Sequence, residues 1–399
     1  MVVETMQALS GSPRLLRNLN EKAVLQHLLA QGALTRAELE AFTGLSKAAM
    51  SDLLKRLEKA AFIRREGEKA GAYGPKAGLW ALDPRAGFVA GVAVSAHSIE
   101  VAIADLSGAV VAEFAQPRRP GEKQWAGDAL HAVLGRATQA AGLDVSALDQ
   151  VVVGLPGIVD AEAGHFRKGQ QIPDWQGFDV PAALIDVLGH KRVLVENDVN
   201  LVTIEEATRG AGIGVGAMIL LWIDEGIGGG LVMGGRLVRG STGSVGEIGG
   251  ALIPDWPGGG VTPATAEALL SSQALTTLLR QFGCPGADVA AEIEMVMRDL
   301  DTYGDLVEVL AYRIAAVLSG IIGMLDPDMV VLAGKVGIAG GTALAQRVKA
   351  ILSTLPLAIP KIVPSMVGRH AVRAGAIELA LEQSRERVFT GGSAARGLP

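Results

Sequence analysis

The chain has 399 residues, 49% hydrophobic and 20% charged, a composition typical of a globular protein with enough apolar residues for two or three domains. Its single cysteine excludes a disulfide framework within the chain and any metal site built from several cysteines. The net charge of −6 is unevenly distributed: residues 1–85 carry 13 lysines and arginines against 9 acids, which favours a polyanionic partner for this part alone.

The start of the chain and its apolar runs indicate a cytoplasmic protein without a membrane contact. Residues 1–13 lack the basic and apolar segments of an export signal, and we expect a loose tail there. The longest apolar run, residues 314–325, has 12 residues including one serine and two glycines, which is too short to span a bilayer.

Residues 20–59 predict three short helices in the order of a helix-turn-helix domain. Thr35 and Glu38 have the spacing of a capping box at the start of the second helix, which ends at Gly44 as the turn requires. The third helix begins after Ser46. Its apolar face consists of Met50, Leu53, Leu54 and Leu57.

The opposite face of the third helix is polar and partly basic with small residues, so it can lie in a major groove of DNA. The candidate DNA-contacting residues are Ser46, Lys47, Ala48, Ser51, Asp52 and Lys55, with Lys76 on a wing. Residues 62–65 and 79–82 predict the two strands of this wing. The alternative is a small helical bundle whose lysines are only solvated, but the capping box, the turn and the wing agree with one another. We expect a winged helix-turn-helix domain at residues 1–84.

After residue 84 the predicted strands alternate with helices, which indicates an α/β fold of two lobes. Residues 88–111 predict a β-hairpin with turns near His97 and Gly108. Further strands are predicted at residues 151–155, 192–195, 217–223 and 329–333, and helices at residues 125–141, 201–209, 305–325 and 368–382. Residues 387–399 have no such pattern, and we expect them to be frayed.

A glycine-rich segment follows the predicted strand at residues 217–223. Gly226 and residues 228–230 let either backbone N–H groups turn toward a ligand or two backbones approach closely. Asp224 and Glu225 stand just before these glycines, and their carboxylates would repel a phosphate. The segment is therefore a poor phosphate cradle.

An amide beside an acid, Asn197-Asp198, follows the predicted strand at residues 192–195. Amide and carboxylate groups together supply the donors and acceptors that the hydroxyls of a polyol need. The alternative is that Asp198 only caps the helix that follows.

These motifs resemble those of the ROK family of repressors, open reading frames and sugar kinases, which has a glycine-rich loop followed by Gly-Glu-Ile-Gly-His. Here residues 246–249 read Gly-Glu-Ile-Gly, and the match covers most of the chain. The resemblance implies a winged helix-turn-helix followed by a two-lobed actin-like/sugar-kinase fold. Its lobes would be residues 85–200 and 201–399, with a last helix that can cross back to the first lobe.

The resemblance also implies a sugar site between the lobes. Family members hold sugar hydroxyls with an Asn-Asp pair, whose acid deprotonates the hydroxyl that the kinases phosphorylate. The matching ligand-binding candidates in this chain are Gly157, Gln171, Asn197, Asp198, Glu247 and Glu267. Three carboxylates repel any phosphate but accept hydrogen bonds from ring hydroxyls, so we expect a neutral, polyhydroxylated effector.

The chain departs from the kinases of the family on the ATP side. Ala93, Ser95, Ala96 and His97 stand where kinases have an acid, two glycines and a threonine that meet Mg-ATP. Glu225 replaces a small threonine, and Lys335 replaces a glycine near the adenosine. We interpret His97 as an exposed turn residue and not as a catalytic base. Gly250 replaces a zinc-binding histidine and residues 256–260 have no cysteine, so no zinc and no other cofactor is expected.

Two functions from different classes follow. One is a sugar-responsive transcription regulator, a repressor without catalytic residues, that binds double-stranded operator DNA as a homodimer or higher homo-oligomer and does not phosphorylate its effector. The other is an ATP-dependent sugar kinase fused to a DNA-binding head. Phosphoryl transfer depends on positioning and charge neutralisation, so the losses on the ATP side favour the regulator. A regulator that binds no ligand stays open, because Gly250 removes one sugar contact of the family.

Overall fold

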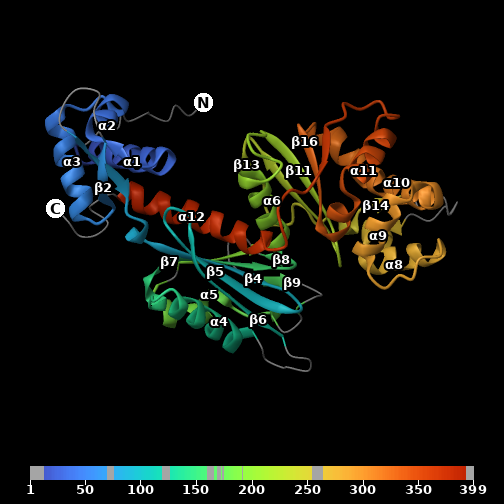
Figure 1. Cartoon of the computed structure of the whole chain (residues 1–399). Helices are drawn as coiled ribbons and strands as arrows, with labels where there is room; N and C mark the ends of the chain where they lie inside the picture. The colour runs from blue at the N-terminus through green and yellow to red at the C-terminus, as the bar shows by residue number, and fades with distance from the viewer. Residues whose placement is uncertain are drawn as a thin grey trace, which may run out of the picture.

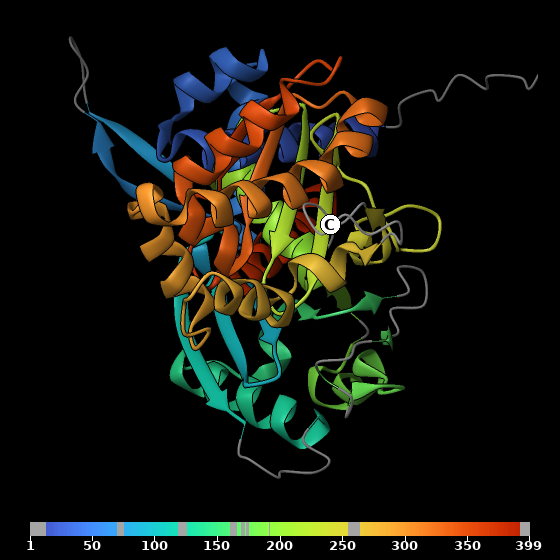
Figure 2. The same ribbon diagram turned by 90° about the vertical axis from the view of Figure 1, so that its right-hand side faces the viewer.

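The computed structural model describes residues 13–69, 76–118, 126–159, 166–168, 172, 175–190, 192–253 and 264–391. Gln171 and residues 256–260, which the sequence singled out, lie outside these ranges. The described chain forms a small head and two larger lobes, and the last helix runs from the head to the junction of the lobes (Figure 1). Figure 2 views the molecule from the second lobe, with the first lobe below it.

The head is a three-helix domain with a two-stranded wing. Its elements are α1 (Pro13–Gln31), β1 (Leu34–Thr35), α2 (Arg36–Thr43), α3 (Lys47–Lys59), β2 (Ile63–Lys69) and β3 (Ala77–Leu82). The capping box is confirmed, because the Thr35 hydroxyl accepts from the N–H of Glu38 and the Glu38 carboxylate accepts from the N–H of Thr35. Gly44 ends α2 at φ +70°, Ser46 caps α3, and the four predicted apolar residues of α3 are buried. The predicted winged helix-turn-helix is confirmed, although α1 already begins at Pro13.

The head shares its apolar core with the last helix, α12 (Ala371–Gly391). Phe389 of α12 is 1% exposed and belongs to the same apolar cluster as Phe62 of the head. The expectation of frayed chain from residue 387 onward is wrong for residues 387–391, because burial of Phe389 against the head extends the helix.

Each lobe contains a five-stranded mixed sheet, and the two sheets have the same topology. Three strands form an antiparallel meander, and two later strands add in parallel beside the first of them. In spatial order the first sheet contains β6 (Val110–Pro117), β5 (Ser98–Asp105), β4 (Phe88–Val94), β7 (Leu148–Leu155) and β10 (Val193–Asn197). The second contains β13 (Arg236–Leu237), β12 (Ile227–Met233), β11 (Ala217–Ile223), β16 (Met329–Ala333) and β17 (Lys361–Pro364). This duplication confirms the predicted two-lobed α/β sugar-kinase fold.

Helices cover the faces of both sheets. In the first lobe α4 (Ala126–Ala140) and α5 (Val180–Leu188) pack on one face, and α6 (Asp198–Arg209) and α12 on the other. The second lobe contains α7 (Ala266–Leu270), α8 (Ser272–Gln281), α9 (Val289–Arg298), α10 (Leu300–Leu325) and α11 (Gly334–Leu352). α12 crosses the first sheet so closely that a Cβ on Gly91 of β4 would overlap the carbonyl of Arg373. The residue limits of the two lobes stay a prediction.

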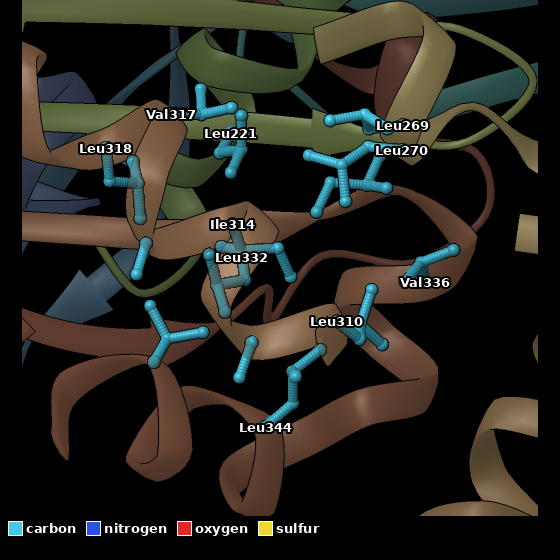
Figure 3. Close-up of a cluster of buried hydrophobic side chains, with 14 of the residues drawn as sticks. Leu221, Leu269, Leu270, Leu310, Ile314, Val317, Leu318, Leu332, Val336 and Leu344 are labelled. Carbon is cyan, nitrogen blue, oxygen red and sulfur yellow. The ribbon is translucent and has the colours of Figure 1, made fainter. Parts of the chain in front are cut away.

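The core of the second lobe is organised around α10, and Figure 3 shows Leu310, Ile314 and Leu318 of this helix among their apolar neighbours. Within the described ranges α10 is the one helix long and apolar enough to cross a membrane, and its 26 residues exceed the 12-residue run noted in the sequence. Ten of its residues are buried in the lobe, so core packing accounts for its apolar side chains.

Candidate ligand site and DNA-binding surface

The candidate ligand site begins where β10 ends and α6 starts. Asn197 caps α6: its Oδ1 accepts from the N–H of Asn200 (3.0 Å), and its Nδ2 donates to the carbonyl of Gly157 (2.9 Å). The alternative that Asp198 caps this helix is wrong, because Asn197 fills that role. Asp198 lies in the first turn and accepts from the N–H of Val199 (2.9 Å), which leaves its carboxylate able to accept further donors.

The glycines of β12 bring α6 against the second sheet. A Cβ on Gly230 would overlap the hydroxyl of Thr203, and a Cβ on Gly228 would lie 3.1 Å from Val199. These two glycines thus make room for side chains of α6, and a close approach of two backbones is seen at Gly246, where a Cβ would overlap the carbonyl of Gly229. The contact of β12 with α6 holds the first turn of this helix, and with it Asp198, between the two lobes.

Two further carboxylates come from the second lobe. Glu267 lies in the first turn of α7, and its Oε2 accepts from the N–H of Ile227 at the start of β12 (2.9 Å). Leu269 and Leu270 hold α7 in the core beside α10 (Figure 3). Glu247 precedes the short helix η4 (Ile248–Gly250) and is exposed.

The charges of these carboxylates act on one another. Withdrawal from water raises the pKa of Asp198 to about 7, and the charges of Glu247 and Asp224 add to the shift. Glu247 is exposed on one side only: partial withdrawal from water, followed by the charge of Glu267, raises its pKa as well. A Cβ on Gly250 would meet no atom within 4 Å, so this side of the site is open. The described ligand-binding candidates thus lie at the junction of the lobes: Gly157, Asn197, Asp198, Glu247 and Glu267. Their binding role stays a prediction.

A second group of charges occupies the end of β11. Lys335, at the start of α11, has its Nζ 3.0 Å from Asp224 Oδ1 and 3.7 Å from Glu225 Oε1. We call these three residues the lysine cluster. Withdrawal from water acts to lower the pKa of Lys335, but the hydrogen bond and charge of Asp224 outweigh this effect and raise it. His97 is exposed, as expected, yet its Nε2 reaches across the lobes to within 3.4 Å of Glu225 Oε1. The lysine cluster therefore places a protonated amine beside the two acids of the glycine-rich segment.

The candidate DNA-contacting residues of the head lie on and beside α3. Ser51 is half-buried, and the other candidates are exposed: Ser46, Lys47, Ala48, Asp52, Lys55 and Lys76. The hydroxyl of Ser46 accepts from the N–H of Ala49 (3.3 Å), so it serves as the helix cap. The ion pairs of the described residues involve neither Lys47 nor Lys55, whereas Nζ of Lys76 lies 3.7 Å from Glu68 Oε2. The uncompensated positive charge is therefore on α3 and not on the wing.

Arg36 is a candidate for DNA contact that the sequence did not reveal. It is the first residue of α2, its Nη1 donates to Ser51 Oγ of α3 (3.3 Å), and its Nε lies 3.0 Å from Glu40 Oε1. In helix-turn-helix domains the first helix of the motif crosses the DNA backbone, so we expect Arg36 to lie near a phosphate, with its charge partly offset by Glu40. Its position directly after the capping Thr35 is the signal that indicates it.

The family matches agree with this arrangement of a head and two lobes. Residues 17–72 match the MarR family, and residues 89–383 match the ROK family. The chain belongs to the ROK family.

Relatives of this ROK protein include regulators and kinases. A putative xylose repressor of Caldicellulosiruptor sp. is 22% identical over 84% of this chain and 88% of its own length. A glucokinase of Halalkalibacterium halodurans is 26% identical over 64% of this chain and 82% of its own length. The crystal structure of a ROK family transcriptional regulator, a homologue of the E. coli MLC protein, has the same fold: the TM-score is 0.73 at 19% identity, with 94% of this chain and 100% of that chain covered.

We expect the folding stability of this ROK protein to depend on pH through Asp198 and Glu205. Withdrawal from water raises the pKa of each carboxyl to about 7. The folded state then binds protons that the unfolded state has already released, so the free energy of unfolding should fall as the pH rises from about 4 to 7. Asp198→Asn and Glu205→Gln each lack one of these titrating groups. The free energy of unfolding of each variant, relative to that of the parent, should therefore increase by about 1–3 kcal/mol between pH 5 and pH 8. Urea denaturation at both pH values measures this gain, and an equal parent–variant difference at pH 5 and pH 8 would contradict it.

Proposed function

We propose that this ROK protein is a cytoplasmic transcriptional repressor that binds operator DNA through α3 and binds a neutral carbohydrate between its lobes without phosphorylating it. It acts as a homodimer, because one recognition helix reads only a few base pairs. The single observation that carries the proposal is the distribution of charge in the interlobe region: carboxylates at the candidate ligand site, and a lysine cluster at the end where kinases of the family hold nucleotide.

The lysine cluster supports binding without phosphorylation. Phosphoryl transfer requires cations that neutralise the phosphates and a metal ion that bridges them. Asp224 and Glu225 would instead present two carboxylates to the phosphates, which costs electrostatic energy. Lys335 is already paired with both acids, so a nucleotide phosphate could use its charge only by breaking these pairs.

The candidate ligand site, which lies beside the lysine cluster, has the groups that a neutral sugar needs. Asp198, Glu247 and Glu267 supply acceptors for ring hydroxyls. Asn197 uses one N–H of its amide on Gly157 and keeps the other for a ligand. Both the putative xylose repressor and the glucokinase are named after sugars, which supports a carbohydrate as the effector of this chain.

The kinase alternative has two observations in its favour. A carboxyl with a pKa of about 7, as at Asp198, suits a general base at neutral pH. The glucokinase relative also shares 26% of the aligned residues. A kinase would, however, need the ATP-side groups that residues 93–97 no longer supply.

Calorimetric titration and a phosphotransfer assay distinguish these functions. We expect glucose, xylose or N-acetylglucosamine to bind, and the phosphate ester of the same sugar to bind at least tenfold more weakly, because three carboxylates face it. With ATP and Mg²⁺ we expect no ADP above the rate without sugar, and elemental analysis should find no stoichiometric zinc. ADP production that depends on one of these sugars would establish the kinase instead, and tight binding of a sugar phosphate would exclude the neutral-effector site.

A further inference from the structure

Glu196, next to the candidate ligand residue Asn197, is a buried carboxylate with both oxygens bonded. The residue is 5% exposed. Its Oε1 accepts from the backbone N–H of Asn197 and from Asn200 Nδ2, both at 2.9 Å. Its Oε2 accepts from Arg239 Nε at 2.6 Å. A buried carboxylate held by three donors has a fixed position, and it fixes the backbone of Asn197 in turn.

The ion pair of Glu196 and Arg239 connects the two lobes. Glu196 lies in β10 of the first sheet, whereas Arg239 follows β13 at the edge of the second sheet. Arg239 also begins the loop that leads to Glu247, and its carbonyl accepts from the N–H of Val245 (3.4 Å). Each partner of the ion pair is therefore close along the chain to a candidate ligand residue, Asn197 in one lobe and Glu247 in the other.

The ion pair forms part of the wall of a cavity of about 1400 Å³. The walls come from α6, α12 and β10 and from the β12–β13 hairpin, and they do not include Asp198, Glu247 or Glu267. Because these elements belong to both lobes, a rotation that brings the lobes together at the ligand site also changes the width of this cavity. Asn200 Oδ1 is buried without a hydrogen-bond partner among the described residues. This oxygen can therefore accept a hydrogen bond in a second arrangement of the two lobes.

The same network leads toward the DNA-binding head. α6, which contains Asn200, packs so closely on α12 that a Cβ on Gly375 would overlap the backbone of Leu201. α12 shares the apolar core of the head through Phe389. The first lobe, α12 and the head therefore form one packed body. The second lobe meets this body at α6, through the glycines of β12, and at Glu196, through Arg239.

We propose that Glu196 and Arg239 form an interlobe latch, a positioning pair that holds Asn197 and Glu247 at the separation the effector requires. The latch also sets how strongly the effector changes operator affinity. This inference rests on the proposed function, since it concerns the same neutral sugar. Glu196 is buried and Arg239 is half-buried, so breaking their ion pair leaves the Glu196 carboxylate without its counter-ion and separates two states of the latch, made and broken. An effector that prefers one arrangement of the lobes shifts the population of these states.

The test compares Arg239→Ala with Arg236→Ala, a matched control. Arg236 is exposed, borders the same cavity and forms no ion pair within the described ranges. The probes are glucose, xylose and N-acetylglucosamine, and a DNA fragment that the parent selects from a random pool. For Arg239→Ala we expect about a tenfold rise in sugar Kd and at least a fivefold smaller effect of sugar on operator Kd. Operator Kd without sugar should stay within twofold of the parent, Arg239→Lys should be intermediate, and Arg236→Ala should match the parent. A parent-like sugar Kd and sugar effect in Arg239→Ala would overturn the latch.

A second measurement does not require a ligand. Spin labels at Gln139→Cys in α4 and Thr277→Cys in α8, both exposed positions, report the distance between the lobes, and the native Cys284 is buried. Arg239→Ala should broaden or shift this distance distribution, whereas Arg236→Ala should not. If the parent binds none of the three sugars, the proposed function fails, and the distance distribution still decides the latch. If Arg239→Ala does not fold cooperatively, Glu196→Gln takes its place, because it preserves the shape of the side chain and removes the charge.

Discussion

Replacing Asp198 with asparagine should weaken binding of the neutral sugar about 10- to 100-fold and leave operator affinity without sugar within twofold of the parent. The substitution keeps the shape of the side chain but removes a charge and converts an acceptor into a donor. Hydrogen bonds to charged groups contribute about 1.5–3 kcal/mol, which corresponds to this loss. Calorimetric titration of the sugar and fluorescence anisotropy of labelled operator measure the two affinities.

The pH dependence of sugar binding provides a control for this variant. The pKa of Asp198 is raised to about 7 by withdrawal from water, and sugar hydroxyls donate to its ionised form. Sugar affinity of the parent should therefore rise with pH until about 7 and then level off, whereas Asp198→Asn should show no such rise. Glu205→Gln, which removes the other carboxyl with a raised pKa in α6, should retain the rise of the parent. If Asp198→Asn responds to the sugar like the parent, or if no sugar alters DNA binding, the proposed ligand site is wrong.

Replacing Lys47 and Lys55 together with alanine should reduce operator affinity by about two orders of magnitude at moderate salt. Each lysine that contacts a phosphate releases counterions on binding, so the slope of log K against log salt should become shallower by nearly two units. Both side chains are exposed on α3, and no carboxylate of the described chain offsets their charges in an ion pair. Fluorescence anisotropy of labelled operator between about 50 and 200 mM KCl measures affinity and slope together.

The wing offers the comparison for this DNA-binding prediction. Lys76 is exposed but lies beside Glu68, so Lys76→Ala should lower the slope by less than one unit. An unchanged affinity of the double variant Lys47→Ala, Lys55→Ala would show that α3 is not the recognition helix.

The elements of the head follow from interactions between residues close in sequence. The capping box joins Thr35 to Glu38 at the start of α2. At its end, the backbone N–H of Gly44 donates to the carbonyl of Glu40. Such contacts act over three or four residues, so the pattern of side chains predicts them directly. The apolar runs at residues 217–223 and 329–333 likewise predict two buried strands, β11 and β16, although the pairing of these strands joins residues distant in the chain.

The sequence by itself determined the helices of the head and several buried strands and helices of the lobes, because capping and hydrophobic periodicity are local. It did not reveal that the glycine-rich segment forms the strand β12. Only the tertiary structure decided what the glycines of β12 and the charged residues between the lobes contact. Thr203, which explains Gly230, belongs to a helix that precedes β12 along the chain. Arg239 bonds to Glu196 over a separation of 43 residues, and the N–H of Lys335 bonds to Asp224 over 111. Glu196 and Arg239 meet because both sheets pack against α6, whereas Asp224 and Lys335 meet because they follow the neighbouring parallel strands β11 and β16. No pattern within a short stretch of sequence encodes which side chains such packing and pairing bring together.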